Sequence, residues 1–206
     1  MATIHVLDET TINKIAAGEV VERPASVIKE LIENSIDASA TNIEVEIGEG
    51  GVAYMRITDN GIGMTEEDAR LAILRHATSK IQQVEDLFDI ASLGFRGEAL
   101  ASIASVSHFS LTTRKADSDL GTRITVDGGT FTDCIPYGAA PGTTIEIKDL
   151  FYNTPARRKF LKTERTEASK IQDIVGKLAL SNPHISFKLI IDLSLIHISE
   201  PTRRVV

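Results

Sequence analysis

Glu30, Asn34 and Asp37 are polar residues spaced four and three positions apart in a stretch that also carries regularly spaced apolar residues. Residues three or four positions apart lie on the same face of an α-helix, so a helix here would bring these side chains together. A carboxylate and an amide oxygen at this spacing can orient a water molecule and ligate a hard cation such as Mg²⁺. A solvated polar helix face has the same pattern, so this row leaves both interpretations open.

A second candidate is the turn at 59–63, where Asp59, Gly61 and Gly63 follow an apolar segment. Glycine lets the backbone approach a ligand closely, and an aspartate at a strand end can accept a hydrogen bond from an exocyclic amine such as that of adenine. Thr143, which opens a later segment of strand-like composition, could bind a base edge in the same way. An ordinary turn and ordinary β-propensity explain the same residues without a ligand.

Phosphate groups could be held by two further stretches. Glycines in 94–100 precede a predicted helix, whose first N–H groups and dipole favour an anion. Two hydroxyls and an ammonium group stand together at 78–80. A flexible hinge and a plain surface loop are the alternatives, and the sequence contains neither a Walker loop nor a Rossmann glycine pattern. The residues concerned are Thr78, Ser79, Lys80, Gly94, Phe95, Arg96, Gly97, Glu98, Ala99 and Leu100.

The elements that would position these residues follow from hydrophobic periodicity. Apolar residues at helical spacing after Pro24 predict an amphipathic helix over 24–37, and alternation predicts a strand over 42–47. Thr65 and the acids after it predict the start of another helix. Further helices are expected at 98–106, 155–161 and 164–180, further strands at 52–58, 107–114, 121–127, 143–148 and 185–191, and a long loop at 76–98. Hairpin-like strand pairs mixed with helices predict an α+β fold, a helical layer on one mixed sheet.

Composition narrows the class of protein. The 206 residues are 42% hydrophobic and 25% charged, which is typical of a globular chain. No apolar run is long enough for a transmembrane helix, the first residues predict no secretory signal, and a single cysteine, Cys134, excludes a disulfide framework. These features fit a cytoplasmic location. The net charge of −7 argues against binding nucleic acid by bulk charge, but 151–177 carries seven Lys/Arg against three acids, so a polyanion contact is expected there.

The order of the motifs resembles the four-box ATP site shared by gyrase, the large ATP-driven heat-shock chaperone, histidine kinases and the MutL family. Longer strings favour the MutL family of DNA mismatch-repair ATPases, from about residue 3 to about residue 192. These strings are IAAGEVVERP at 15–24, RHATSK at 75–80, GFRGEAL at 94–100 and LFYNTPARRKF at 150–160. The resemblance implies a Bergerat-type ATP-binding fold, a two-layer α/β sandwich whose mixed, mostly antiparallel sheet is covered on one face by helices.

The resemblance also implies a role for each motif. Glu30 would be the general base that activates water, Asn34 the ligand of Mg²⁺, and Asp59 the acceptor from adenine. Phosphoryl transfer needs positioning and charge neutralisation more than covalent chemistry, which fits such a set. Asp37, Ala38, Gly61, Gly63, Met64 and Thr143 would line the nucleotide, and 78–80 with 94–100 would form a lid over the phosphates.

In this family ATP acts as a slow switch that closes two N-terminal domains into a dimer. The resemblance therefore implies ATP and Mg²⁺ as cofactors, a homodimer, the mismatch-recognition protein MutS and DNA as partners, and no membrane. Contact with DNA is expected through Arg157, Arg158, Lys159 and Lys162.

The resemblance divides the chain into an N-terminal arm at 1–20, an ATP-binding domain at 21–193 and a tail at 194–206 that no longer looks like the family. We expect this tail to pack poorly. The second domain of the family, which supplies a lysine to the γ-phosphate, and the C-terminal dimerisation domain do not follow in this sequence. Three hypotheses remain: a MutL-type ATPase module, a fragment that binds nucleotide or DNA without turnover, and another member of the same ATP-fold group, such as a histidine kinase or topoisomerase subunit.

Overall fold

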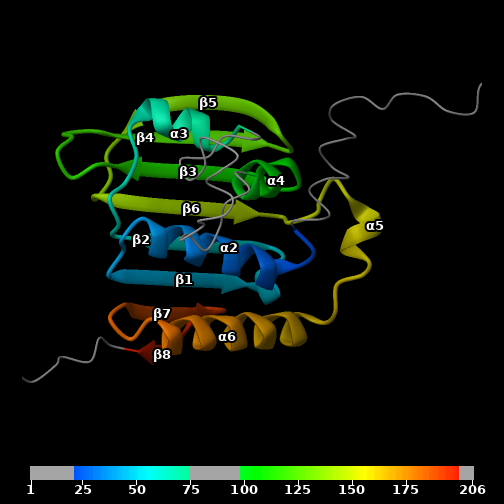
Figure 1. Cartoon of the computed structure of the whole chain (residues 1–206). Coiled ribbons are helices and arrows are strands. Elements are labelled where there is room, and N and C mark those ends of the chain that lie inside the picture. The colour runs from blue at the N-terminus through cyan, green and yellow to red at the C-terminus, as the bar shows by residue number, and fades with distance from the viewer. Residues whose placement is uncertain (1–20, 75–97, 200–206) are drawn as a thin grey trace, which may run out of the picture.

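A single sheet organises the part of the chain that the computed structural model describes, which is residues 21–74 and 98–199. Its eight strands lie in the order β5-β4-β3-β6-β2-β1-β7-β8 (Figure 1). Neighbouring strands run antiparallel, except that β1 and β7 run parallel. The strands are β1 (Asn42–Gly48), β2 (Tyr54–Asp59), β3 (His108–Arg114), β4 (Gly121–Asp127), β5 (Thr130–Tyr137), β6 (Gly142–Lys148), β7 (Ser186–Ile191) and β8 (Ser194–Ser199).

Helices cover one face of this sheet (Figure 1). They are α2 (Pro24–Asp37), α3 (Glu66–Ala72), α4 (Ala99–Ser105) and α6 (Glu164–Ser181), with a short helix α5 (Pro155–Arg158) at the edge and a 3-10 turn η1 (Glu49–Gly51). The predicted two-layer fold, a mostly antiparallel sheet with helices on one face, is confirmed. Among the described residues, none of the helices is long and apolar enough to cross a membrane.

The core lies between the two layers, where α2 meets the middle of the sheet. Ile43, Val45 and Ile47 of β1 are buried toward the helices, while the residues between them are only half-buried. On the opposite face of the sheet, Arg56 forms ion pairs with Glu44 and Glu46. The alternation predicted for this strand therefore separates an apolar face from a charged one.

Most predicted elements are present, with boundaries that agree to within three residues. The strand predicted at 52–58 begins at Tyr54 because η1 precedes it, which places Asp59 in the last position of β2. The helix predicted at 155–161 ends at Arg158. Two strands, β5 and β8, were not expected. β5 is an edge strand exposed almost throughout, and it contains Pro136, which an edge strand tolerates.

The described part of the tail beyond 193 forms a strand, β8, that was not among the predicted elements. The backbone of Ser194–Ser199 pairs antiparallel with β7 and extends the sheet by one strand. The side chains that begin this strand contribute little to the core, since Leu193 is 89% exposed and Leu195 is 60% exposed. Backbone hydrogen bonds thus account for an edge that the hydrophobic pattern did not predict.

Candidate functional site

Asp59 is a buried carboxylate held in place by its neighbours. Its Oδ2 accepts a hydrogen bond from the Ser35 hydroxyl at 2.8 Å, and its Oδ1 accepts one from the Gly61 N–H at 2.9 Å. The Ser35 hydroxyl also lies 3.1 Å from the carbonyl oxygen of Leu31. The last residue of β2 is thereby fixed against the last turns of α2.

Burial raises the pKa of the Asp59 carboxyl above its ordinary value of 3.8. The N–H of Gly61, the Ser35 hydroxyl and the N–H of Thr143 act in the opposite direction, because each stabilises the ionised form. Desolvation is the largest of these effects. A carboxylate kept away from water in this way gains more from a new hydrogen-bond donor than an exposed one would.

The glycines after Asp59 are required by close contacts with the protein's own backbone. A Cβ atom at Gly61 would lie 2.6 Å from the Ala38 carbonyl oxygen, which accepts the Ile62 N–H at 3.0 Å. Gly63 has φ +65°, and a Cβ atom there would overlap the Arg114 carbonyl. These contacts press the turn against the end of α2 and the end of β3, so both glycines have a structural role.

A second hydrogen-bond cluster joins this turn to the central strands. The Thr113 hydroxyl accepts from the Met64 N–H at 2.9 Å and donates to the Gly142 carbonyl at 3.0 Å. Its oxygen lies 3.1 Å from the Thr143 hydroxyl oxygen. Thr143 pairs across the sheet with Asp59. The structure therefore brings Asp59, Gly61, Gly63, Met64 and Thr143 together, as predicted.

Glu30 and Asn34 of the polar row on α2, followed by the C-cap residue Ala38, lie on a path toward this cluster. Glu30, Asn34 and Ala38 recur every four residues and are half-buried, whereas the apolar side of the helix faces the core. An α-helix rises 1.5 Å per residue, so Glu30 and Ala38 are separated by about 12 Å along the axis. Because 3.6 residues, not four, complete a turn, each of these residues lies slightly further around the helix than the one before. The row thereby approaches the side of α2 that carries Ser35, the partner of Asp59.

A positive charge lies beside this row. The Lys29 ammonium is 2.8 Å from one Glu33 carboxylate oxygen and 3.9 Å from a Glu30 oxygen. Glu33 is therefore the principal partner of Lys29, while the Glu30 carboxylate is one-third exposed and faces outward from the helix. Asp37, the last residue of α2, is half-buried at the end of the helix that carries Ala38.

The remaining predicted residues divide into two groups. Glu98, Ala99 and Leu100 are half-buried where α4 begins, and α4 packs beside α2. The residues Thr78, Ser79, Lys80, Gly94, Phe95, Arg96 and Gly97 lie outside the described residues, as does the arm at 1–20.

The predicted basic contact lies at the edge of the molecule, around α5 (Figure 1). Arg158, Lys159 and Lys162 are exposed, whereas Arg157 is half-buried with its guanidinium 5.7 Å from the centre of the Phe151 ring. Phe160, between the cations, is 82% exposed. Three of the four predicted cations are thus accessible.

Ser35 and Thr113 hold the site together but were not among the residues predicted from the sequence. Each breaks a local pattern, and that was the available signal. Ser35 continues the apolar stripe of α2 yet is polar, and Thr113 is buried next to another buried threonine where a strand should alternate. A polar residue at an apolar position indicates a buried hydrogen-bonding partner.

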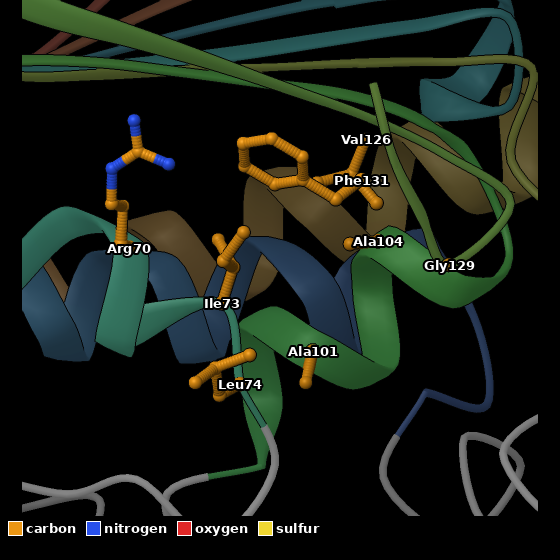
Figure 2. A pocket seen from close by; sticks show the side chains of 8 residues that line it. All are labelled: Arg70, Ile73, Leu74, Ala101, Ala104, Val126, Gly129 and Phe131. Atoms are coloured by element: carbon orange, nitrogen blue, oxygen red, sulfur yellow. The ribbon is translucent and has the colours of Figure 1, made fainter. Parts of the chain in front are cut away.

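A separate cavity of about 310 Å³ lies between α3, α4 and the β4–β5 hairpin (Figure 2). Apolar side chains dominate its wall, and Arg70 stands at one side. None of the predicted site residues lines it. Its lining residues are Arg70, Ile73, Leu74, Ala101, Ala104, Val126, Gly129 and Phe131.

Metal ligands are sparse in the described part of the chain, which contains no cluster of three or more His, Cys, Asp or Glu side chains suited to a metal ion. Mg²⁺ does not need such a cluster, since proteins usually bind it through one or two side chains, substrate phosphates and water. The amide oxygen of Asn34, which is four residues from Glu30 on α2, fits that mode.

Comparison with known proteins gives the family. Residues 22–130 match the model of the histidine kinase-, DNA gyrase B- and HSP90-like ATPases. The DNA mismatch repair protein MutL of Caldanaerobacter subterraneus subsp. tengcongensis is 59% identical over 93% of this chain and 32% of its own length. MutL of Xanthomonas axonopodis pv. citri is 52% identical over 98% of this chain and 31% of its own length.

A solved structure shares the fold. The ATPase domain of Aquifex aeolicus MutL in complex with ADP is 36% identical, with a TM-score of 0.71 over 89% of this chain and 65% of that one. The chain spans about a third of the length of the MutL relatives it matches.

Proposed function

Since the chain belongs to the histidine kinase-, DNA gyrase B- and HSP90-like ATPase family, we propose that it binds ATP along α2 and hydrolyses it with Glu30 as the general base. The observation that carries this proposal is the hydrogen-bonded, buried Asp59 carboxylate beside the glycine turn. A carboxylate in this setting is suited to accept a hydrogen bond from the amino group of adenine.

In this proposal the nucleotide lies along α2. Adenine lies at the Asp59 and Thr143 end of the site, with Ala38, Gly61, Gly63 and Met64 around it. The triphosphate extends along α2 toward Asn34 and Glu30, about 12 Å away along the helix axis. An aspartate that is buried and hydrogen-bonded favours recognition of the base, whereas a glutamate that is partly exposed favours contact with an attacking water.

Glu30 and Asn34 divide the chemistry. The Glu30 carboxylate orients a water molecule and accepts its proton as the terminal phosphate leaves. The Asn34 amide oxygen is the ligand that α2 offers to Mg²⁺, which neutralises phosphate charge when bound. Thr78, Ser79, Lys80 and the stretch 94–100 close over the phosphates as a lid, which excludes water and completes the site.

The MutL relatives suggest the setting of this activity. We propose that the chain is the ATPase module of a mismatch-repair protein, in which ATP drives lid closure and dimerisation. MutS and DNA are the proposed partners. The exposed cations Arg158, Lys159 and Lys162, with the half-buried Arg157, form the proposed DNA contact, because their positive charges would attract the phosphates of DNA.

Calorimetry with Mg·ATP and a turnover assay on the 206-residue chain test this function. Replacing the proposed base in a Glu30→Gln variant should lower turnover by about 10²–10⁴-fold and leave the affinity for ATP within a few-fold of wild type. Glu67→Gln, on the exposed first turn of α3, is the matched control and should change neither quantity.

Other outcomes decide between the alternatives. Binding without turnover by wild type would support a nucleotide-binding module that needs further sequence for hydrolysis. A folded wild-type chain that does not bind ATP would contradict the proposal for this chain. Equal turnover by wild type and Glu30→Gln would remove Glu30 from the mechanism.

A further inference from the structure

Glu167 is a completely buried carboxylate outside the proposed ATP site. It stands in the first turn of α6 with 0% of its surface exposed. Its Oε1 accepts a hydrogen bond from the Lys162 N–H at 3.0 Å, while its Oε2 has no hydrogen-bond partner in the described structure. Burying a carboxylate is costly, so this side chain needs a compensating interaction.

That interaction comes from the start of α2. Arg23 is the N-cap residue of this helix, and its Nη1 lies 3.9 Å from Glu167 Oε1. Within the described structure α2 has no side-chain cap hydrogen bond, and its first turn contains no acidic residue. The Glu167 carboxylate therefore lies against the side chain of the N-cap residue of α2 and attracts its guanidinium.

The 3-10 turn η1 packs closely against the start of α2 and against α6. A Cβ atom at Gly50 would lie 2.7 Å from the Glu164 carbonyl oxygen, so η1 is pressed against the first turn of α6. A Cβ atom at Gly51 would lie 3.0 Å from both Pro24 and Ile171. The first turns of α2 and α6 are thus joined through η1 and through the Arg23–Glu167 pair.

We propose that Glu167 is a positioning residue, which acts through Arg23 to set the place of α2 and with it Glu30 and Asn34. The inference rests on the proposed ATP site. Replacing a buried ion pair with apolar groups is often neutral or even stabilising, and here Arg23 is 31% exposed, so stability alone does not account for the pair. Its specific effect is orientation, because Glu30 lies seven residues beyond Arg23 on the same helix.

A Glu167→Gln variant separates orientation from folding. Glutamine keeps the size and an acceptor for the Lys162 N–H but removes the charge that attracts Arg23. We expect kcat to fall on the order of tenfold to a hundredfold, since small misplacements of catalytic groups have effects of this size. The KM for ATP should change by less than about threefold, because adenine recognition at Asp59 lies at the other end of α2.

Hydrogen exchange in α2 gives a second readout that does not depend on ATP. Backbone amides in the first two turns of α2 should exchange several-fold faster in Glu167→Gln, while the amides of β3 and β6 remain unchanged. Glu164→Gln is the matched control, because Glu164 is in the same turn of α6 but exposed. It should alter neither kcat nor exchange.

Failure of the inference is distinct from failure of the proposed function. Unchanged exchange in α2 with unchanged kcat would overturn the positioning role, even if wild type hydrolyses ATP. If wild type does not bind ATP, the function fails and the exchange measurement still decides whether Glu167 holds α2. If Glu167→Gln does not fold, Arg23→Met removes the charge from the other member of the pair and keeps an unbranched apolar side chain, and normal kcat and normal exchange in α2 of that variant would contradict the inference.

Discussion

Burial of the Asp59 carboxylate lowers the stability of the free protein, whereas in the proposed site it strengthens the binding of a ligand. Its carboxylate is buried, and burial raises its pKa although three donors stabilise the ionised form. The ionised group therefore reduces the stability of the free protein at neutral pH. This cost is understandable if the carboxylate is kept ready for a ligand that brings its own hydrogen-bond donor.

An Asp59→Asn variant should separate the contribution of the charge to ATP binding from its effect on folding. The amide can accept the Gly61 N–H and donate to the Ser35 hydroxyl, which then donates to the Leu31 carbonyl, so the fold is maintained. Loss of the charged acceptor should weaken ATP binding roughly tenfold to a hundredfold. Calorimetry measures the affinity, and Asp173→Asn, an exposed change on α6, is the control. Undiminished affinity would place adenine elsewhere.

The pH dependence of unfolding tests the same residue without a ligand. Because the pKa of Asp59 is raised in the folded state, the folded protein holds a proton that the unfolded chain has released. The free energy of unfolding should therefore fall as pH rises from about 3.8 through the folded pKa. Asp59→Asn should lack this component and should match or exceed wild-type stability at pH 7, with the difference vanishing below pH 3.8.

At the scale of elements, the same substitution has opposite effects in a turn and in a helix. Gly63→Ala should lower the free energy of unfolding by at least about 1–2 kcal/mol, because φ is +65° and the new Cβ would overlap the Arg114 carbonyl. Gly176→Ala in α6 should raise it by about 0.5–1 kcal/mol, because no atom lies within 4 Å of the new Cβ and alanine favours helix. Urea unfolding measures both free energies of unfolding. A change of the same sign in the two variants would contradict the difference between the turn and the helix.

The elements also show what periodicity could predict. α2 and β1 were predicted closely because each has one buried face, which imposes a repeat on the sequence. β5 and β8 lie at the two edges of the sheet. The side chains of β5 are exposed almost throughout and therefore impose no repeat on its sequence. Edge strands are held by backbone hydrogen bonds, and those leave little trace in the order of side chains.

The candidate site was predictable to a similar extent. Residues with a conspicuous type and spacing, such as Asp59 with Gly61 and Gly63, were identified, and the structure brings them together. Ser35 and Thr113 were missed because their function depends on a partner that is distant in sequence. Asp59 lies 24 positions from Ser35, and a pairing of that length becomes visible only once β2 is placed beside α2.

At the scale of the molecule, the proposed ATP site belongs to the centre of the sheet. Asp59, Thr143 and Thr113 come from β2, β6 and β3, which are adjacent strands. A ligand that bridges these strands and α2 stabilises the unit on which the rest of the sheet depends. Binding should therefore appear as stabilisation of the whole domain, with least effect at the edge strands β5 and β8.

Thermal unfolding with Mg·ATP measures this coupling. At a ligand concentration one hundred times Kd, binding to the folded state alone adds about 2.7 kcal/mol, which corresponds to a Tm increase of about 5–10 °C for a chain of this size. Hydrogen exchange should slow in β2, β3 and β6 and change least in β5 and β8. Asp59→Asn at the same nucleotide concentration should show a much smaller Tm increase. An equal increase in that variant would mean that ATP stabilises the chain from another site, because a ligand that no longer reaches Asp59 cannot join α2 to the central strands.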